Sequence, residues 1–293
     1  MKNDGFFIKS QFANIESTAF LTGNASTTSR STTGYGRARK DGRKRSLQVR
    51  MRSADSGIAS KRLSCIGLPC VVDQLSVYKE VISGCRIASD ENISFTAGRT
   101  VIVTKWADYT GKIGFGCVLN DGTLCVLFTD GSSLGHRLAS SCGGERYKLL
   151  ANVNEQPPAI VEWERAKDVK DSKVLKKIKY AAQFEHFMNS RLRAASSFDV
   201  VSPYVNLLLY EKRCKHALLL VLSSGVTQIN FLETHEKLIL WRGEHSHIYA
   251  TVVHDEHGKY TCRMVRGGPQ PTLPQSRLLQ KLISRARRCF DED

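Results

Sequence analysis

Most of the chain consists of apolar runs separated by turn signals. From Thr100 the runs are VIVTKW, KIGFGCVL and LCVLF, a weaker Ser- and Gly-rich stretch up to Cys142, and then RYKLLANV and AIVEW. The segments NDG at 120–122 and DG at 130–131 are typical of hairpin turns. Residues 171–192 place an apolar side chain at every third or fourth position, which predicts a helix of about five to six turns after the sheet.

This block occurs twice. The pattern VL-x-x-G at 118–122 recurs at 221–225, and Phe128 recurs as Phe231, so both features return after 103 positions. A second amphipathic helix is predicted from about Ser276 to Phe290. Two half-buried sheets with one helix each can cover each other's apolar faces, which predicts an α+β fold packed as a β-sandwich. We expect a ligand site in the cleft between the sheets.

A separate helical stripe precedes the first block. Within residues 68–84, the apolar side chains of Val71, Leu75, Tyr78 and Ile82 lie three or four positions apart. A proline suits the first turn of this helix and a glycine its C-cap. Because an isolated helix of this length is only marginally stable, we expect it to dock on the rest of the protein.

Residues 1–64 are rich in Ser, Thr, Gly and Arg and show no sustained hydrophobic period. Such a segment cannot bury enough apolar surface to offset its conformational entropy, so we expect it to be disordered. Nine Lys and Arg residues and one acid lie between Arg30 and Arg52, which supplies more than half of the formal charge of +15. The run RARKDGRKR at 37–45 is either a solvated charge run or a nuclear-localisation or nucleic-acid patch.

The cysteines indicate reduced thiols. There are nine of them and no CxxC pair, and several lie in or beside apolar strand runs, where a thiol behaves as a small hydrophobe. We therefore expect neither a disulfide framework nor a zinc site, and a cytosolic or nuclear environment. No secretory signal and no run of 18 apolar residues is present, so we expect no membrane span. The cysteines are Cys65, Cys70, Cys85, Cys117, Cys125, Cys142, Cys214, Cys262 and Cys289.

The sequence predicts neither a metal site nor protein kinase activity. His245, His247, His254 and His257 are close in sequence but have no cysteine nearby and fall at strand ends or turns, so we expect no metal and no cofactor. A protein kinase needs a Gly-rich loop, a VAIK-type lysine, an HRD loop and a DFG aspartate. Because the sequence contains none of these motifs, the chain as given is not expected to transfer phosphate.

The stretch TQINFLETHEKLIL at 227–240 carries the clearest candidate for binding chemistry. It predicts a strand up to Phe231, a turn over Glu233-Thr234 and a second strand. His235 and Lys237 are two positions apart, so on one strand they would point the same way and form a small cationic pair. Such a pair favours a bound anion. The alternative is a solvated polar face beside a hairpin.

This stretch and VTKWADYTGKIGFG at 103–116 together resemble the polo-box region of polo-like kinases, and the resemblance extends from Thr100 to Asp293. It implies two polo boxes, each a six-stranded antiparallel sheet plus one helix, with a preceding cap helix that straps the second box. The implied map is a tail at 1–64, a polo-cap-like helix and linker at 65–98, the first box at 99–192, a linker at 193–203 and the second box at 204–293.

The resemblance also implies a phosphopeptide site. His235 and Lys237 would hold the phosphate of a phosphoserine or phosphothreonine in a Ser-pSer/pThr-Pro type of segment. Trp106 would stack on the residue before the phosphate. Leu192 and Arg193 would add a main-chain contact. The same first-box motif supplies two further candidates, Lys105 and Tyr109.

Several positions depart from the family pattern. Trp241 stands where a small residue is usual, and Ile113 stands where tyrosine is usual. In the first helix, Ala181, Ala182, Gln183 and Phe187 replace a more aromatic pattern. A secondary hydrophobic pocket of the family is built from this region, so the resemblance does not carry that pocket over to this chain.

The segment DSGIAS at 55–60 resembles a phosphodegron read by a ubiquitin-ligase adaptor. Its elements are Asp55, Ser56, Gly57 and Ser60, and phosphorylation of both serines would add about three to four negative charges. The alternative is a chance match in a Ser-rich tail.

The sequence thus predicts a non-catalytic module that binds phosphorylated proteins and directs localisation. The resemblance implies sites at the centrosome or spindle pole, the kinetochore or the midbody, from a cytoplasmic and nuclear pool. One alternative is the C-terminal part of an active Ser/Thr kinase. Another is nucleic-acid binding through the basic tail, which we do not expect to be the main activity.

Overall fold

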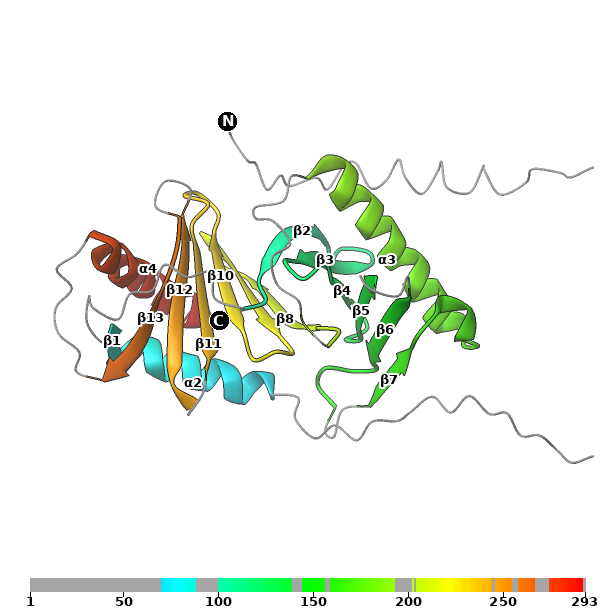
Figure 1. The fold of residues 1–293 in the computed structure, drawn as a ribbon, viewed down its shortest axis with the longest axis horizontal. Helices are drawn as coiled ribbons and strands as arrows, with labels where there is room; N and C mark the ends of the chain where they lie inside the picture. The colour runs from blue at the N-terminus through cyan, green and yellow to red at the C-terminus, as the bar shows by residue number, and fades with distance from the viewer. Residues whose placement is uncertain are drawn as a thin grey trace, which may run out of the picture. The chain divides into compact units, whose positions relative to one another are not determined.

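The computed structural model describes residues 70–87, 100–138, 144–155, 159–192, 202, 204–243, 246–254, 258–266 and 274–291, all of which belong to one compact unit (Figure 1). The predicted disordered tail, its basic run and the DSGIAS motif lie outside these residues. They therefore stay predictions.

The first block forms a six-stranded antiparallel meander in the order β2-β3-β4-β5-β6-β7, as predicted. Its glycine turns are as expected, since Gly122 (φ 80°) and Gly131 (φ 78°) both adopt the left-handed conformation of hairpin turns. The strands are β2 (Val103–Tyr109), β3 (Gly114–Leu119), β4 (Leu124–Phe128), β5 (Ser133–Leu138), β6 (Glu145–Leu150) and β7 (Ile160–Trp163).

After a short 3-10 turn, η2 (Ala166–Asp168), the predicted helix forms as α3 (Ser172–Arg191). The Asp171 side chain caps its first turn by accepting a hydrogen bond from the Lys173 amide at 2.8 Å. The helix packs on the sheet at Gly116, where an added Cβ would lie 2.4 Å from the ring of Phe184. Gly116 is therefore needed for this close approach of helix to sheet.

The second block repeats this plan with one difference. It supplies six antiparallel strands and a helix, α4 (Pro274–Asp291), but its sheet has seven strands in the order β1-β13-β12-β11-β10-β9-β8. The extra edge strand, β1 (Cys85–Ile87), pairs antiparallel with β13. The other strands are β8 (Leu208–Arg213), β9 (Ala217–Leu222), β10 (Thr227–Phe231), β11 (Lys237–Arg242), β12 (Ile248–His254) and β13 (Gly258–Arg266).

The predicted cap helix is α2 (Val71–Gly84), which begins after Cys70 rather than at the proline. Tyr78 and Ile82 are buried in one apolar cluster with α4 and the second sheet, so the helix docks as expected (Figure 1). The Tyr78 hydroxyl donates to the Gly225 carbonyl at 2.7 Å, and burial raises the pKa of Tyr78. Arg287 of α4 donates to the Ile82 carbonyl at 3.0 Å.

The two sheets share a second apolar cluster, which confirms the predicted sandwich. Phe115 and Leu119 of the first sheet and Leu220 and Ile239 of the second are fully buried in it. A buried glutamine, Gln228 of β10, also joins the two sheets through hydrogen bonds to the backbone of Val103. Its side-chain oxygen accepts from the Val103 amide at 2.7 Å, and its nitrogen donates to the Val103 carbonyl at 3.0 Å.

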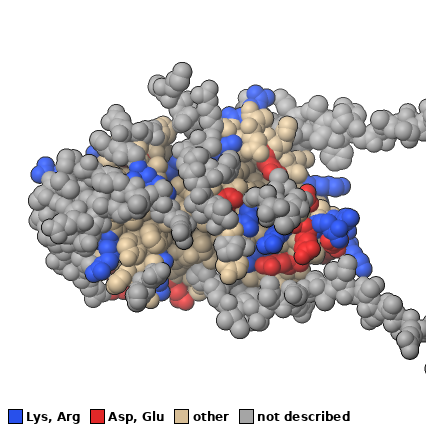
Figure 2. All heavy atoms as spheres, in the orientation of Figure 1, with Lys and Arg blue, Asp and Glu red and all other residues tan. Residues whose placement is uncertain are grey.

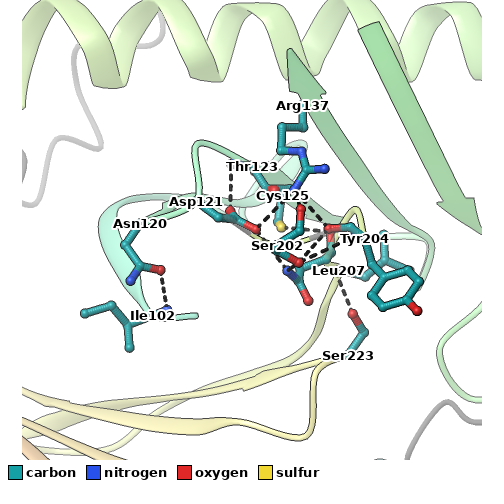
Figure 3. Close-up of polar contacts among 11 residues, drawn as sticks. Ile102, Asn120, Asp121, Thr123, Cys125, Arg137, Ser202, Tyr204, Leu207 and Ser223 are labelled. Carbon is teal, nitrogen blue, oxygen red and sulfur yellow. Dashed lines mark hydrogen bonds and ion pairs between the residues drawn. The ribbon is translucent and has the colours of Figure 1, made fainter. Parts of the chain in front are cut away.

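The residues that lead into β8 are held against the first sheet. Arg137 of β5 donates to the carbonyls of Ser202 and Tyr204, and it lies 3.7 Å from the buried carboxylate of Asp121 (Figure 3). The Asp121 carboxylate also accepts from the Asn206 side chain at 3.1 Å. A Cβ added at Gly135 would lie 2.4 Å from the Asn206 carbonyl oxygen, so only glycine allows the segment before β8 to run this close to β5.

The six cysteines whose side chains the structure describes are all free thiols. Five of them are buried, and burial raises the pKa of Cys125 and of Cys262, which keeps these thiols protonated and unreactive. No described helix combines the length and the apolar composition needed to cross a membrane.

Candidate phosphopeptide site

The β10–β11 connection consists of the five residues 232–236. It is closed by a hydrogen bond from the Phe231 amide to the Glu236 carbonyl at 2.9 Å. His235 is the fourth of these five residues and has φ 57°, in the left-handed region. The prediction that His235 and Lys237 share a strand face is therefore wrong for His235, because only Lys237 belongs to β11. The loop needs a left-handed residue to turn into the strand.

Glu236, between the two predicted phosphate-binding residues, holds this loop through its buried side chain. Its side chain is buried, at 7% exposure. One carboxylate oxygen accepts from Arg285 at 2.9 Å and from the Thr234 hydroxyl at 2.6 Å, and the other lies 3.7 Å from His254 Nε2. The guanidinium of Arg285 also lies 4.3 Å from the centroid of the Phe231 ring.

A second set of contacts holds the outer side of the loop. The Leu232 amide donates to the His216 carbonyl at 3.0 Å, and the His216 ring lies 2.8 Å from the Glu233 carboxylate. With these contacts in place, His235 is exposed and Lys237 is half-buried at the start of β11. The loop thus presents its histidine from a fixed backbone.

One face of β11 continues from Lys237 toward the inter-sheet cluster. Ile239 and Trp241 belong to or pack against that cluster, whereas Leu238 and Leu240 face α2 and α4. Trp241 is half-buried and stacks on Tyr249 with centroids 4.6 Å apart, and its indole nitrogen donates to the Thr251 hydroxyl at 3.0 Å. The tryptophan that departs from the family pattern therefore lies on the same strand face as Lys237.

Trp106 lies on β2, the edge strand of the first sheet. It is half-buried, packs against the same inter-sheet cluster as Trp241, and stacks on Phe115 with centroids 5.7 Å apart and an interplanar angle of 13°. The structure thus brings residues from both predicted motifs, Trp106 and the face of β11 that carries Lys237, to one apolar cluster. The predicted cleft at this place stays a prediction.

The remaining predicted site residues have internal contacts or lie outside the described chain. Lys105 Nζ donates to the Met188 carbonyl and to Asn189 Oδ1, both at 3.3 Å, and burial lowers the pKa of Lys105. Tyr109 is only 7% exposed, so its side chain is not available at the surface. Leu192 is the C-cap of α3. Arg193 lies outside the described residues.

Within the described part of the chain, no group of three or more His, Cys, Asp or Glu residues is placed to hold a metal ion. Of the four clustered histidines, His245 and His257 lie outside that part. The basic and acidic side chains that are described are interspersed on the face shown in Figure 2. Some of them form ion pairs, such as Lys148 with Glu162 at 3.2 Å.

The sequence did not reveal the anchor between Glu236 and Arg285. An acid in a polar turn predicts exposure, and an arginine on a helix predicts a solvated side chain. The available signal was the helical period of the predicted second helix: Arg285 directly precedes Ala286, which is buried, so its stem lies at the border of the packed face.

No protein-family model matches the chain. Among curated proteins, it is similar to mouse serine/threonine-protein kinase PLK2, with 27% identity over 166 residues, 55% of this chain and 23% of the kinase. PLK2 of Pongo abelii is 30% identical over 142 residues, 47% of this chain and 19% of the kinase. The chain thus spans only about a quarter or less of the length of these relatives.

Among solved structures, the chain is similar to the budding yeast Cdc5 polo-box domain in complex with an Spc72 phosphopeptide. The TM-score is 0.50 and the identity 21%, and the likeness covers 78% of this chain and 84% of that one. At this identity the likeness shows the fold, and it agrees with the tandem arrangement of two sheets described above.

Proposed function

We propose that this chain, a tandem polo-box fold with sequence similarity to the polo-like kinases, binds peptides that contain phosphoserine or phosphothreonine. The single observation that carries the proposal is the geometry of the β10–β11 loop. It presents His235 from an anchored backbone, two positions before the half-buried Lys237 and next to a cluster that Trp106 also borders. The likeness to a polo-box domain solved with a phosphopeptide supports the same function.

The chemistry of the two side chains suits a phosphate dianion. Lys237 offers up to three N–H donors, and a protonated His235 offers two. Charge-assisted hydrogen bonds of this kind contribute roughly 1.5–3 kcal/mol each. A dianion between them also relieves the repulsion of two neighbouring cations.

The peptide on either side of the phosphate would lie along the first sheet. Because β2 is an edge strand, its backbone can pair with an added extended segment. Gln228 already occupies the backbone groups of Val103, so the added segment would pair further along β2, near Trp106. The half-buried indole offers a flat apolar surface for the residue before the phosphate.

In this proposal the chain is a non-catalytic targeting module, since its sequence lacks the kinase motifs. The relatives are named serine/threonine-protein kinases, so the alternative remains that the chain is the C-terminal part of an active kinase. Proposed partners are phosphorylated proteins at the centrosome or spindle pole, the kinetochore or the midbody. A ubiquitin-ligase adaptor that reads phosphorylated DSGIAS is a further proposed partner.

The test is a titration of a labelled Ser-phosphoThr-Pro peptide against the wild-type protein and the double variant His235→Ala/Lys237→Met. Loss of two charge-assisted bonds is expected to weaken binding more than about a hundredfold. Circular dichroism controls for folding. Wild-type protein that binds the unphosphorylated peptide equally well would disprove the proposal. Binding to nucleic acid through the basic tail would instead survive the double substitution and fall steeply with salt.

A further inference from the structure

We infer that Arg285 and Glu236 form a positioning pair that fixes the backbone at His235 and so sets the affinity for phosphopeptide, without contacting the peptide. This inference rests on the proposed function of His235 and Lys237. It concerns two residues on different elements: Glu236 at the entrance to β11, and Arg285 on α4.

The buried carboxylate of Glu236 depends on Arg285. Glu236 is flanked in sequence by His235 and Lys237, yet its own side chain points away from the surface, at 7% exposure. A carboxylate in such a place needs partners, and Arg285 at 2.9 Å is the cation that contacts it most closely. Without the guanidinium, the carboxylate would move outward to reach water and would carry its backbone with it.

The backbone of Glu236 also holds the loop. The carbonyl of Glu236 accepts the Phe231 amide that closes the loop, so this residue joins the loop to the sheet through both its backbone and its side chain. His235 precedes it in the left-handed conformation, which is unfavourable for a residue with a Cβ. Such a conformation persists only while the surroundings hold it. Once Glu236 is released, the loop can relax and move the His235 imidazole away from Lys237.

A second arginine on α4 allows the positioning of His235 to be distinguished from a general effect on protein stability. Arg287, on the same helix, also joins α4 to another element, since it donates to the carbonyls of Ile82 and Ser83 at 3.0 Å each. These contacts hold α2 and not the 232–236 segment. Arg287 is therefore a matched control for Arg285: both substitutions remove an arginine contact of α4, and only one of them releases the loop.

The experiment uses the full chain and the labelled Ser-phosphoThr-Pro peptide at one ionic strength. Arg285→Ala is expected to weaken binding about tenfold and Arg287→Ala by less than about twofold, although both lower the melting temperature. In a His235→Ala background, Arg285→Ala is expected to cost less than about twofold more, because the histidine that it positions is already gone. Arg285→Lys keeps the charge and is expected to recover part of the affinity.

A backbone measurement makes the inference independent of the peptide. The three-bond coupling between the His235 amide and Hα protons reports φ, and it is expected to change in Arg285→Ala and in Glu236→Gln but not in Arg287→Ala. An equal loss of affinity with Arg287→Ala, or an undiminished Arg285→Ala effect in the His235→Ala background, would overturn the inference. If the wild-type protein does not bind the phosphopeptide, the proposed function is wrong, and so is the inferred effect on affinity. If the coupling of His235 still changes in Arg285→Ala, the inference that Arg285 and Glu236 fix the loop backbone holds independently.

Discussion

The two boxes contain corresponding hairpins, joined by four residues (129–132) in the first box and by five (232–236) in the second. In the first box the Phe128 amide donates to the Ser132 carbonyl at 2.8 Å, and in the second the Phe231 amide donates to the Glu236 carbonyl at 2.9 Å. Each loop contains a left-handed residue. In the first box it is Gly131 (φ 78°), whereas in the second it is His235 (φ 57°).

In both boxes, a cation from the helix contacts the hairpin. Lys177 of α3 contacts the Asp130 carboxylate and lies 4.8 Å from the centroid of the Phe128 ring. In the second box, Arg285 of α4 contacts Glu236 and lies 4.3 Å from the centroid of Phe231. A helix cation, a hairpin carboxylate and a phenylalanine ring thus recur in both boxes.

The difference agrees with the proposed role of the second hairpin in presenting a side chain. Glycine takes the left-handed conformation without steric cost, so the first hairpin has no strain to hold. Histidine there is strained, and strain of this kind persists where a side chain must be presented at a particular place. In the second box an arginine contacts a buried acid and the neighbouring Thr234 hydroxyl, whereas in the first box a lysine contacts an exposed acid, which agrees with a more rigid second hairpin.

The boxes differ again in how their cores are completed. The second sheet shares its core with α4 and with α2, which precedes the repeat, and β1 extends its edge. The described part of the first box packs α3 on its sheet. The second box therefore depends on a segment that lies outside its own repeat.

The largest effect on stability is expected from weakening the contact between α2 and the core of the second box. Ile82 of α2 is fully buried in the second core, so Ile82→Ala should lower the free energy of unfolding by about 2–5 kcal/mol. Val72→Ala on the same helix is the control, because Val72 is 69% exposed and should change stability by less than about 0.5 kcal/mol. Urea denaturation measures both. Equal values would mean that α2 does not contribute to the core.

Much of this architecture could be predicted from periodicity. The hairpin glycines, the long helices and the cap helix all follow from apolar spacing and turn residues, and the 103-residue repeat predicts two similar sheets. Strand β1 was missed because three residues are too short to show a period. The left-handed His235 was missed because alternation continues through Lys237, and loop length, not side-chain pattern, decides where a strand begins.

The predicted site was only partly accessible to the same reasoning. Placing Trp106 and the β11 face on one cluster requires the packing of the two sheets, which no local pattern specifies. Tyr109 belongs to the same sequence motif as Trp106, yet it is buried, at the end of β2. The motif assigned both residues to the site, whereas their exposure depends on what packs over each of them.

The next largest effect is expected at the left-handed position of the second hairpin. His235→Gly keeps the backbone conformation and removes the imidazole, so phosphopeptide binding should weaken about tenfold or more through loss of one charge-assisted bond. Stability should stay the same or rise, since the steric cost of about 1–2 kcal/mol disappears while the flexible unfolded chain gains entropy. Fluorescence anisotropy and urea denaturation give the two quantities. A glycine variant that binds as tightly as wild type would show that the strained residue has no role in recognition.

The reciprocal change in the first hairpin should act on stability alone. Gly131→Ala places a Cβ in the left-handed conformation and 3.2 Å from Asn152 Oδ1, so the free energy of unfolding should fall by about 1–2 kcal/mol. Gly111→Ala is the control, because no atom lies within 4 Å of its added Cβ. Peptide affinity should be unchanged in both variants. A loss of affinity with Gly131→Ala would contradict the division between a structural and a presenting hairpin.

The smallest effect concerns the pH dependence of the first hairpin. Burial acts to raise the pKa of Asp130, but hydrogen bonds from Lys177 and Ser132 outweigh it, so the pKa lies below the usual value of 3.8. A carboxyl group whose pKa is lowered by folding stabilises the protein above the unfolded pKa, and this contribution is lost as the pH falls through the folded pKa. Asp130→Asn should therefore lower the melting temperature slightly at pH 7, and the difference from wild type should shrink as the pH falls below 3.8. The effect is small because the Asp130 side chain is 60% exposed and solvent screens its ion pair. A difference that stays constant down to the acid transition would show that the Lys177 contact does not stabilise the charged form, and the parallel with Arg285 and Glu236 would then rest on geometry alone.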